Sequence, residues 1–199
     1  MSANMNRARI DFYFDFISPY SYLAATRLEA FGHRYGADFE WLPINLPRLI
    51  QWSDNTSPAM IRNKALYSIR DLKRWARFLD VPLTMHRPGS FDSRPALRMA
   101  LALQGDERAR FSMAVFNSIW SGAVDPKQDD WLTQVMAQHQ LPAIALPRQD
   151  DALDTLTRQA LNAGAFGAPT FFLHRKRGRA EMFFGVDHMD FLARACEAL

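Results

Sequence analysis

The sequence of 199 residues contains a single cysteine, Cys196. One cysteine excludes an internal disulfide, a Cys-x-x-Cys redox centre and a metal site built from thiolates. The five histidines show no metal-ligand spacing either, so no metal site is expected. Net charge is also small, because 24 basic and 21 acidic residues leave only +3. This balance argues against DNA or RNA as a partner.

Long apolar runs are missing as well. The longest stretch without Asp, Glu, Lys or Arg, residues 131–147, contains three glutamines, a histidine and two prolines, so no membrane-spanning segment is expected. Asp11 and Asp15 interrupt the apolar stretch near the N-terminus, which predicts no secretory signal and a cytoplasmic protein. Apolar residues still make up 48% of the chain. That share predicts a globular protein with a core of ordinary size.

The apolar pattern predicts a β-α-β opening. Residues 9–16 place Ile10, Phe12, Phe14 and Phe16 on one face, which is typical of a strand. Ser18 followed by Pro19 is a strong helix start signal, and the predicted helix runs to about residue 35. Residues 38–44 read as the second strand.

Helices are expected from about residue 50 to 165, followed by a β-β-α ending. The helices predicted from capping and periodicity cover about 58–80, 94–104 (Ser93 cap), 107–121 (Asp106 cap), 130–140 (Asp129 cap) and 149–163. Residues 170–173 and 180–184 predict a hairpin, and its basic turn, His174–Arg179, is interpreted as solvated. The last helix, 187–198, has Asp187 as its expected N-cap.

This order of elements resembles a thioredoxin-like fold with a large all-helical insertion. The expected thioredoxin-like domain comprises residues 1–48 and 166–199, and the inserted helical domain comprises residues 49–165. In the thioredoxin superfamily the loop after the first strand carries Cys-x-x-Cys at a helix N-terminus. Here the corresponding tetrapeptide is Ser-Pro-Tyr-Ser at residues 18–21, so any thiol at this place has to come from outside the chain.

Glutathione is the expected external thiol, and longer motifs point the same way. Residues 11–23, Asp-Phe-Tyr-Phe-Asp-Phe-Ile-Ser-Pro-Tyr-Ser-Tyr-Leu, resemble the opening of the 2-hydroxychromene-2-carboxylate isomerases. These enzymes are relatives of kappa-class glutathione transferases within the DsbA-like group. Further matches, in chain order, are Asn55–Ala59, Lys64-x-x-Tyr67, Arg70–Trp75, Val115–Trp120, Phe166–Thr170 and Phe184–Asp187. The resemblance implies an α/β thioredoxin-like fold of the DsbA and kappa transferase type.

Ser18 has two interpretations. Taken alone, Ser-Pro makes it a helix N-cap and nothing more. Its place where a thioredoxin-type nucleophile stands, in a chain without Cys-x-x-Cys, favours a role in catalysis. A hydroxyl donates one hydrogen bond, and a hydrogen bond to the thiolate lowers the pKa of a bound thiol. The resemblance gives the matching serine this role.

The resemblance also implies a set of glutathione-binding residues. Pro169 is expected to be cis, with the backbone of Ala168 paired to the cysteinyl unit. The γ-glutamyl unit is expected at Gly185, Val186 and Asp187. Asn55 is expected to contact the peptide and Lys64 the glycyl carboxylate. The alternatives to these roles are a passive loop, a helix cap, a turn and a solvated lysine. Substrate contacts are predicted for Tyr20, Asp92, Arg94 and Trp120, of which Trp120 is more typical of the core.

The function implied is a glutathione-dependent isomerase. It would interconvert a 2-hydroxychromene-2-carboxylate and a trans-o-hydroxybenzylidenepyruvate in aromatic catabolism, by reversible thiolate addition, with glutathione as a cofactor that is not consumed. One alternative is a kappa-like glutathione transferase. The other is a non-catalytic thioredoxin-like binding module. The expected partners are a small aromatic carboxylate and a second copy of the chain in a homodimer, with no nucleic acid and no membrane.

Overall fold

The computed structural model describes residues 7–141 and 151–199. Its sheet has four strands in the order β2-β1-β3-β4, namely β1 (Ala8–Phe14), β2 (Ala37–Pro43), β3 (Thr170–Leu173) and β4 (Glu181–Phe184). β1 and β2 are parallel, whereas β3 is antiparallel to both β1 and β4. A mixed sheet of this order, with helices on both faces, is the predicted thioredoxin-like fold.

Helices make up much of the remaining described chain. They are α1 (Pro19–Ala25), α2 (Leu28–Tyr35), α3 (Leu46–Trp52), α4 (Arg62–Phe78), α5 (Arg94–Ala102), α6 (Gly105–Ser121), α7 (Trp131–Gln138), α8 (Asp151–Ala163) and α9 (Met189–Glu197), with short 3-10 turns η1 (Pro58–Met60) and η2 (Val186–His188). In the described part of the chain, no helix combines the length and apolarity needed to cross a membrane.

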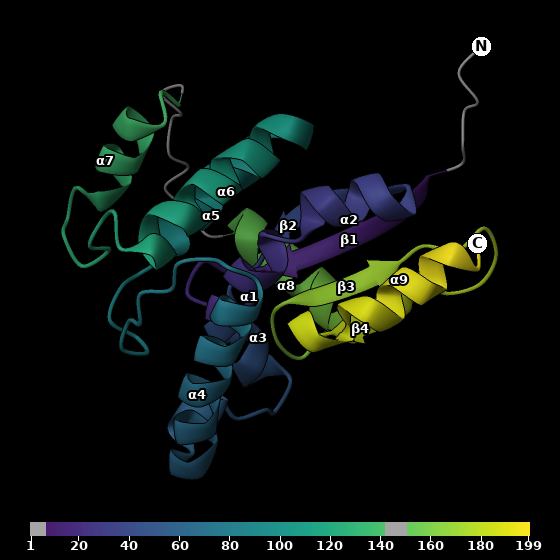
Figure 1. Cartoon of the computed structure of the whole chain (residues 1–199), viewed down its shortest axis with the longest axis horizontal. Coiled ribbons are helices and arrows are strands. Elements are labelled where there is room, and N and C mark those ends of the chain that lie inside the picture. Colours follow the sequence, from purple (N-terminus) through teal and green to yellow (C-terminus); the bar gives the residue numbers. More distant parts are fainter. Residues whose placement is uncertain (1–6, 142–150) are drawn as a thin grey trace.

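Alternation along β1 gives the sheet two buried faces. Ile10, Phe12 and Phe14 point to one side, into the larger core that α1, α2, α6 and α9 help to form. Tyr13 points to the other side, with Phe172 of β3, into a smaller core closed by α3 and α8. Figure 1 shows α9 in front of the sheet and α8 behind it. α1 therefore begins at the end of a strand that is fixed on both faces.

Of the helices between β2 and β3, α4 extends away from the sheet (Figure 1), whereas α5 and α6 contact β2. α4 projects from the region of α1, while α5, α6 and α7 lie together at the opposite side of the molecule (Figure 1). α8 contacts β2 and α3, so it packs on the sheet itself. The division of the chain after residues 48 and 165 stays a prediction.

Three local expectations were wrong. The helix predicted over residues 18–35 is two helices, because Thr26 and Arg27 end α1. The Thr26 hydroxyl donates to the Leu23 carbonyl oxygen, and the Arg27 guanidinium donates to Val186 O at 3.0 Å and to Asp190 Oδ1 at 3.1 Å. α3 was not expected at all. Asp187 does not cap the last helix, because the 3-10 turn η2 precedes α9 and places Asp187 inside that turn.

Other expected caps also moved. Gln104 and Asp130 are the N-caps of α6 and α7, in place of Asp106 and Asp129. Ser93 is at the N-cap position of α5, but its side chain makes no capping bond because its hydroxyl is bound elsewhere, as described below. The start of the helix predicted over 149–163 lies partly outside the described residues.

Candidate active site

Ser18 stands at the N-terminus of α1 with both capacities of its hydroxyl in use. Its Oγ accepts from Ser21 N at 3.1 Å, as an N-cap does, and donates to the Ala168 carbonyl oxygen at 3.1 Å. Ser18 is 5% exposed. Pro19 has no N–H, and Ser21 and Tyr22 donate to the Ser18 side chain and backbone. Within the described residues, the Tyr20 N–H is the amide of this turn left for an anion.

The loop before β3 lies against Ser18. Its Ala168–Pro169 peptide bond is cis, as predicted. Pro169 is buried, and its carbonyl oxygen accepts from Gly185 N at 3.0 Å. The loop therefore joins the start of α1 on one side to the turn before α9 on the other.

Asn55 lies beside the same loop. Its Nδ2 donates to the Phe166 carbonyl oxygen at 3.2 Å, and its Oδ1 accepts from Thr56 N at 2.8 Å. Asn55 is exposed, so its amide is open to solvent on the remaining side. The structure thus brings Asn55, Ser18 and Ala168 into one neighbourhood.

The Gly185–Asp187 turn needs its glycine. Gly185 has φ of 91°, and a Cβ there would collide with the Asp187 carboxylate, which folds back over the turn. Val186 is 1% exposed and its carbonyl oxygen accepts from Arg27, whereas Asp187 is exposed. The Asp187 carboxylate therefore lies at the surface, in the space that a Cβ of residue 185 would take.

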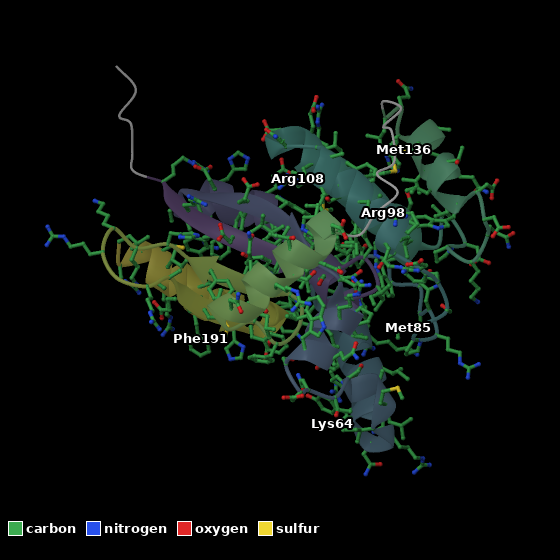
Figure 2. The ribbon with its side chains drawn as sticks, turned by 180° about the vertical axis from the view of Figure 1, so that it is seen from behind. Lys64, Met85, Arg98, Arg108, Met136 and Phe191 are labelled. Carbon is green, nitrogen blue, oxygen red and sulfur yellow. The ribbon has the colours of Figure 1, made fainter. Side chains whose placement is uncertain are left out.

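Lys64 and Tyr20 are connected through α4. The Tyr20 hydroxyl donates to Asp71 Oδ2 at 3.0 Å, and burial with the Asp71 charge raises the pKa of Tyr20. Lys64 is exposed on α4, at the part of this helix that lies away from the sheet (Figure 2). It lines a surface hollow of about 400 Å³ together with Pro58, Asn63, Tyr67 and Ser68. No contact joins Lys64 to Ser18 among the described residues.

The other predicted substrate residues differ in exposure. Asp92 and Arg94 are exposed and form a bidentate ion pair, with Arg94 Nη2 at 2.7 Å from Asp92 Oδ2, and this pair lowers the pKa of Asp92. Trp120 is 2% exposed and its Nε1 donates to the Phe16 carbonyl oxygen at 3.1 Å. Trp120 thus lies in the core, and a substrate contact by its ring stays a prediction.

Sequence analysis missed Asp15, which is fully buried three residues before Ser18. Burial raises its pKa to about 6, although hydrogen bonds from Ser93, Leu46 and Ile17 lower it. A carboxylate between two phenylalanines at the end of an apolar strand was the available signal, since an ionised group there needs several donors.

Cys196 lies on α9 and is 8% exposed. Burial raises the pKa of its thiol to about 11, so thiolate is scarce at neutral pH. The described residues hold no group of three or more His, Cys, Asp or Glu side chains arranged for a metal ion. The candidate site therefore offers a hydroxyl, backbone groups and charged side chains.

The comparisons with known proteins agree with this fold. The family model for the DsbA-like thioredoxin domain matches residues 9–197. A 2-hydroxychromene-2-carboxylate isomerase of Sphingobium xenophagum is 34% identical over 92% of this chain and 95% of its own. Glutathione S-transferase kappa 1 of Caenorhabditis elegans is 28% identical, over 93% and 89%. A solved 2-hydroxychromene-2-carboxylate isomerase superposes with a TM-score of 0.80 at 28% identity, covering 96% of this chain and 95% of its own. The chain belongs to the DsbA-like thioredoxin family, in which 2-hydroxychromene-2-carboxylate isomerases and kappa-class glutathione transferases are its relatives.

Proposed function

We propose that this protein is a glutathione-dependent isomerase that interconverts a 2-hydroxychromene-2-carboxylate and a trans-o-hydroxybenzylidenepyruvate. The relatives named isomerases support an isomerase in the broad sense. The observation that carries the finer proposal is the Ser18 hydroxyl beside the Ala168–Pro169 loop, in a chain whose one thiol is buried on α9. A reacting sulfur at Ser18 must then belong to a ligand.

The residues proposed for glutathione suit a tripeptide with two carboxylates and an ammonium group. The Ala168 backbone offers the pairing groups of a short strand. The Asn55 amide suits a peptide group, and Asp187 suits the γ-glutamyl ammonium. Lys64 suits the glycyl carboxylate as a mobile point charge. Gly185 permits the positive φ of 91° that brings the Asp187 carboxylate over the turn, and an added Cβ would displace this carboxylate.

Glutathione, when bound, supplies a thiolate that adds reversibly to the substrate, permits rotation in the ring-opened form and leaves again. The role of Ser18 is to donate a hydrogen bond from its hydroxyl to that sulfur, which lowers the pKa of the thiol. In the structure the Ser18 hydroxyl donates to Ala168 O, with 3.1 Å between the two oxygen atoms. The hydroxyl therefore has to rotate, and the released Ala168 carbonyl can accept an N–H from the ligand instead. The one bond between Ser18 and Ala168 would then be replaced by two bonds to the ligand.

We propose that the small aromatic carboxylate substrate contacts Tyr20, Asp92, Arg94 and Trp120. The hydroxyl of Tyr20 is held by Asp71, which fixes a half-buried aromatic ring one residue beyond Pro19. Arg94 is the candidate partner for the substrate carboxylate. That carboxylate has to share the guanidinium with Asp92, which already accepts three of its bonds.

A kappa-like glutathione transferase is the second candidate, because the kappa 1 transferase of C. elegans matches 93% of this chain. Both activities need the same thiolate. The experiment is to mix protein, substoichiometric glutathione and 2-hydroxychromene-2-carboxylate, then follow product absorbance and free thiol. Many turnovers per glutathione support the isomerase. Loss of one thiol per product favours the transferase, and absence of both glutathione binding and turnover rejects the proposal in favour of a binding module.

We also propose a homodimer in the cytoplasm. Large apolar side chains are exposed along η1 and α4, namely Met60, Ile61, Leu66, Tyr67, Ile69 and Phe78. Exposed large apolar side chains gathered on one segment support an interface with a second copy of the chain. A reduced thiol cofactor also fits a reducing compartment. Sedimentation equilibrium gives the mass in solution, and a monomer at all concentrations up to the enzyme's working range contradicts the dimer.

A further inference from the structure

The carboxylate of Asp15 joins three segments that are far apart in the sequence. Its Oδ1 accepts from Ile17 N at 3.1 Å and from the Ser93 hydroxyl at 2.7 Å, and its Oδ2 accepts from Leu46 N at 2.8 Å. Ile17 is in the loop before α1, Leu46 is the first residue of α3, and Ser93 is the residue before α5. Asp15 is 0% exposed and Ser93 is 4% exposed. The carboxylate and the Ser93 hydroxyl are therefore shielded from water, while Ile17 and Leu46 are partly buried.

The arrangement suits a carboxyl side chain. The Ile17 and Leu46 N–H groups face different oxygens, and Asp or Glu offers an acceptor on both, while the Ser93 hydroxyl can donate or accept. An asparagine at this position would turn an NH2 group toward one of the donors. The charge that acts on Asp15 is the Asp92 carboxylate, which has the same sign and is itself paired with Arg94. Packing alone would favour an apolar residue here, because burying a charge is costly.

Each joined segment leads directly to a part of the candidate site. Ser18 N donates to the Asp15 carbonyl oxygen at 3.0 Å, so the residue that holds the carboxylate also holds the loop that presents Ser18. Ser93 separates Asp92 from Arg94, the candidate substrate residues. α3 leads to Asn55, whose N–H donates to Ile50 O at 3.1 Å at the end of that helix.

We propose that Asp15 is a positioning residue. Its buried carboxylate holds the loop of Ser18, the start of α3 and the Asp92–Arg94 segment in fixed positions relative to one another. This inference rests on the proposed function, which assigns Ser18 to the glutathione thiolate and Asp92 and Arg94 to the substrate. Asp15 would align these two groups of residues. Asp15 does not touch either ligand. Its effect passes through the three donors.

Two variants separate the three hydrogen bonds to the Asp15 carboxylate, each of which is called an arm of the junction. Ser93→Ala removes the bond from the residue before α5 and leaves the bonds from Ile17 and Leu46. Asp15→Asn weakens all three bonds with little change in side-chain volume. Asp11→Asn is the matched control, because it neutralises a carboxylate on the same strand whose partners are His174 and Arg9. Its kinetics should equal those of the wild type.

The expected results differ between the two sides of the site. Since misplacement of a substrate group by about 1 Å costs up to about a hundredfold, Ser93→Ala should raise the substrate KM about tenfold. Its glutathione Kd and the titration midpoint of the bound thiol should not change. Asp15→Asn should raise KM similarly, lower kcat at neutral pH, and also raise the thiol midpoint. The double variant should have the KM of Asp15→Asn alone, because both changes cut the same arm.

Amide hydrogen exchange in the ligand-free protein tests the junction without glutathione. Asp15→Asn should speed exchange at Ile17 and Leu46, and Asp11→Asn should not. A wild-type protein that fails to bind glutathione would reject the proposed function, while faster exchange at both amides would still support the junction. Unchanged exchange overturns the inference. So does a folded Ser93→Ala protein with wild-type KM, which decides the question even if Asp15→Asn fails to fold. Additive KM effects in the double variant also overturn it.

Discussion

The Ser18 hydroxyl donates to the carbonyl oxygen of Ala168 at 3.1 Å, although 150 residues separate the two in the chain. The bond couples the two halves of the proposed thiolate site. Because the same hydroxyl also accepts from Ser21 N, it cannot leave its place when it rotates. The Ser18 oxygen therefore stays in place, and only its O–H bond turns from Ala168 O to the sulfur.

Ser18→Ala should therefore act mainly on the thiol. The lost hydrogen bond to a charged acceptor is worth about 1.5–3 kcal/mol, which raises the pKa of bound glutathione by about one to two units. Turnover at neutral pH should fall about ten- to a hundredfold and partly recover as the pH rises. The measurement is thiolate absorbance of the bound glutathione against pH. Equal midpoints in variant and wild type would show that Ser18 is only a cap.

Thr26→Ala is the control for the helix itself. Thr26 ends α1 and its hydroxyl donates to Leu23 O at 2.8 Å, so its loss affects α1 from the opposite end. Both variants should lower the free energy of unfolding, Ser18→Ala by about 1 kcal/mol as N-cap loss does. Only Ser18→Ala should move the thiol midpoint.

Cys196→Ala should keep turnover. The Cys196 thiol is buried, and its pKa of about 11 leaves little thiolate at neutral pH. The reacting sulfur is supplied by the ligand. Activity assays before and after the substitution check this, with urea unfolding to confirm the fold. A stable Cys196→Ala protein without activity contradicts the external thiol.

Asp15 should make stability depend on pH in a defined direction. Burial raises its pKa in the folded protein from 3.8 to about 6, so the folded state binds the proton more tightly than the unfolded state does. The contribution of Asp15 to the free energy of unfolding is fully present below pH about 4. It falls by about 3 kcal/mol as the pH rises to about 6 and does not change further above that pH. Urea unfolding of wild type and Asp15→Asn at several pH values gives the difference. A difference that does not change between pH 4 and 7 rejects the shift.

Gly185→Ala should weaken glutathione binding, because a Cβ at this turn collides with the Asp187 carboxylate. Gly178 provides a close control. It has φ of 92°, against 91° for Gly185, and nothing within 4 Å of an added Cβ. Both variants should lose about 1–3 kcal/mol of stability from the backbone conformation. Calorimetry should find about tenfold weaker binding only in Gly185→Ala, and equal losses of affinity in both would contradict a role for this turn.

Lys64→Gln should weaken glutathione binding several-fold, since an exposed charge pair is worth up to about 1 kcal/mol. Lys73→Gln, another exposed lysine on α4, should not. The sharper measurement uses γ-glutamylcysteine, which lacks the glycyl carboxylate. Lys64→Gln should bind this dipeptide as the wild type does. An equal loss of affinity for both ligands contradicts the assigned carboxylate contact.

Sequence reasoning predicted the strands, most helices and the cis Ala168–Pro169 bond, because these rest on local signals and on motifs of the family. α3 was missed although Asn45 and Pro47 carry the cap and proline signals that correctly identified α1. Asp15 could not be understood from the sequence. Its three donors come from the neighbouring loop, from residue 46 and from residue 93, and only the folded chain brings them together.

Arg27 gives a practical constraint on engineering. Its guanidinium binds Val186 O and Asp190 Oδ1, so the break between α1 and α2 and the turn before α9 form one mechanical unit. A chimera that replaces residues 185–199 with the segment of another protein must therefore bring acceptors for Arg27, or exchange residue 27 at the same time. A chimera that is joined at the cis-proline loop would separate Arg27 from Val186 and Asp190, although this loop is a convenient boundary in the linear sequence.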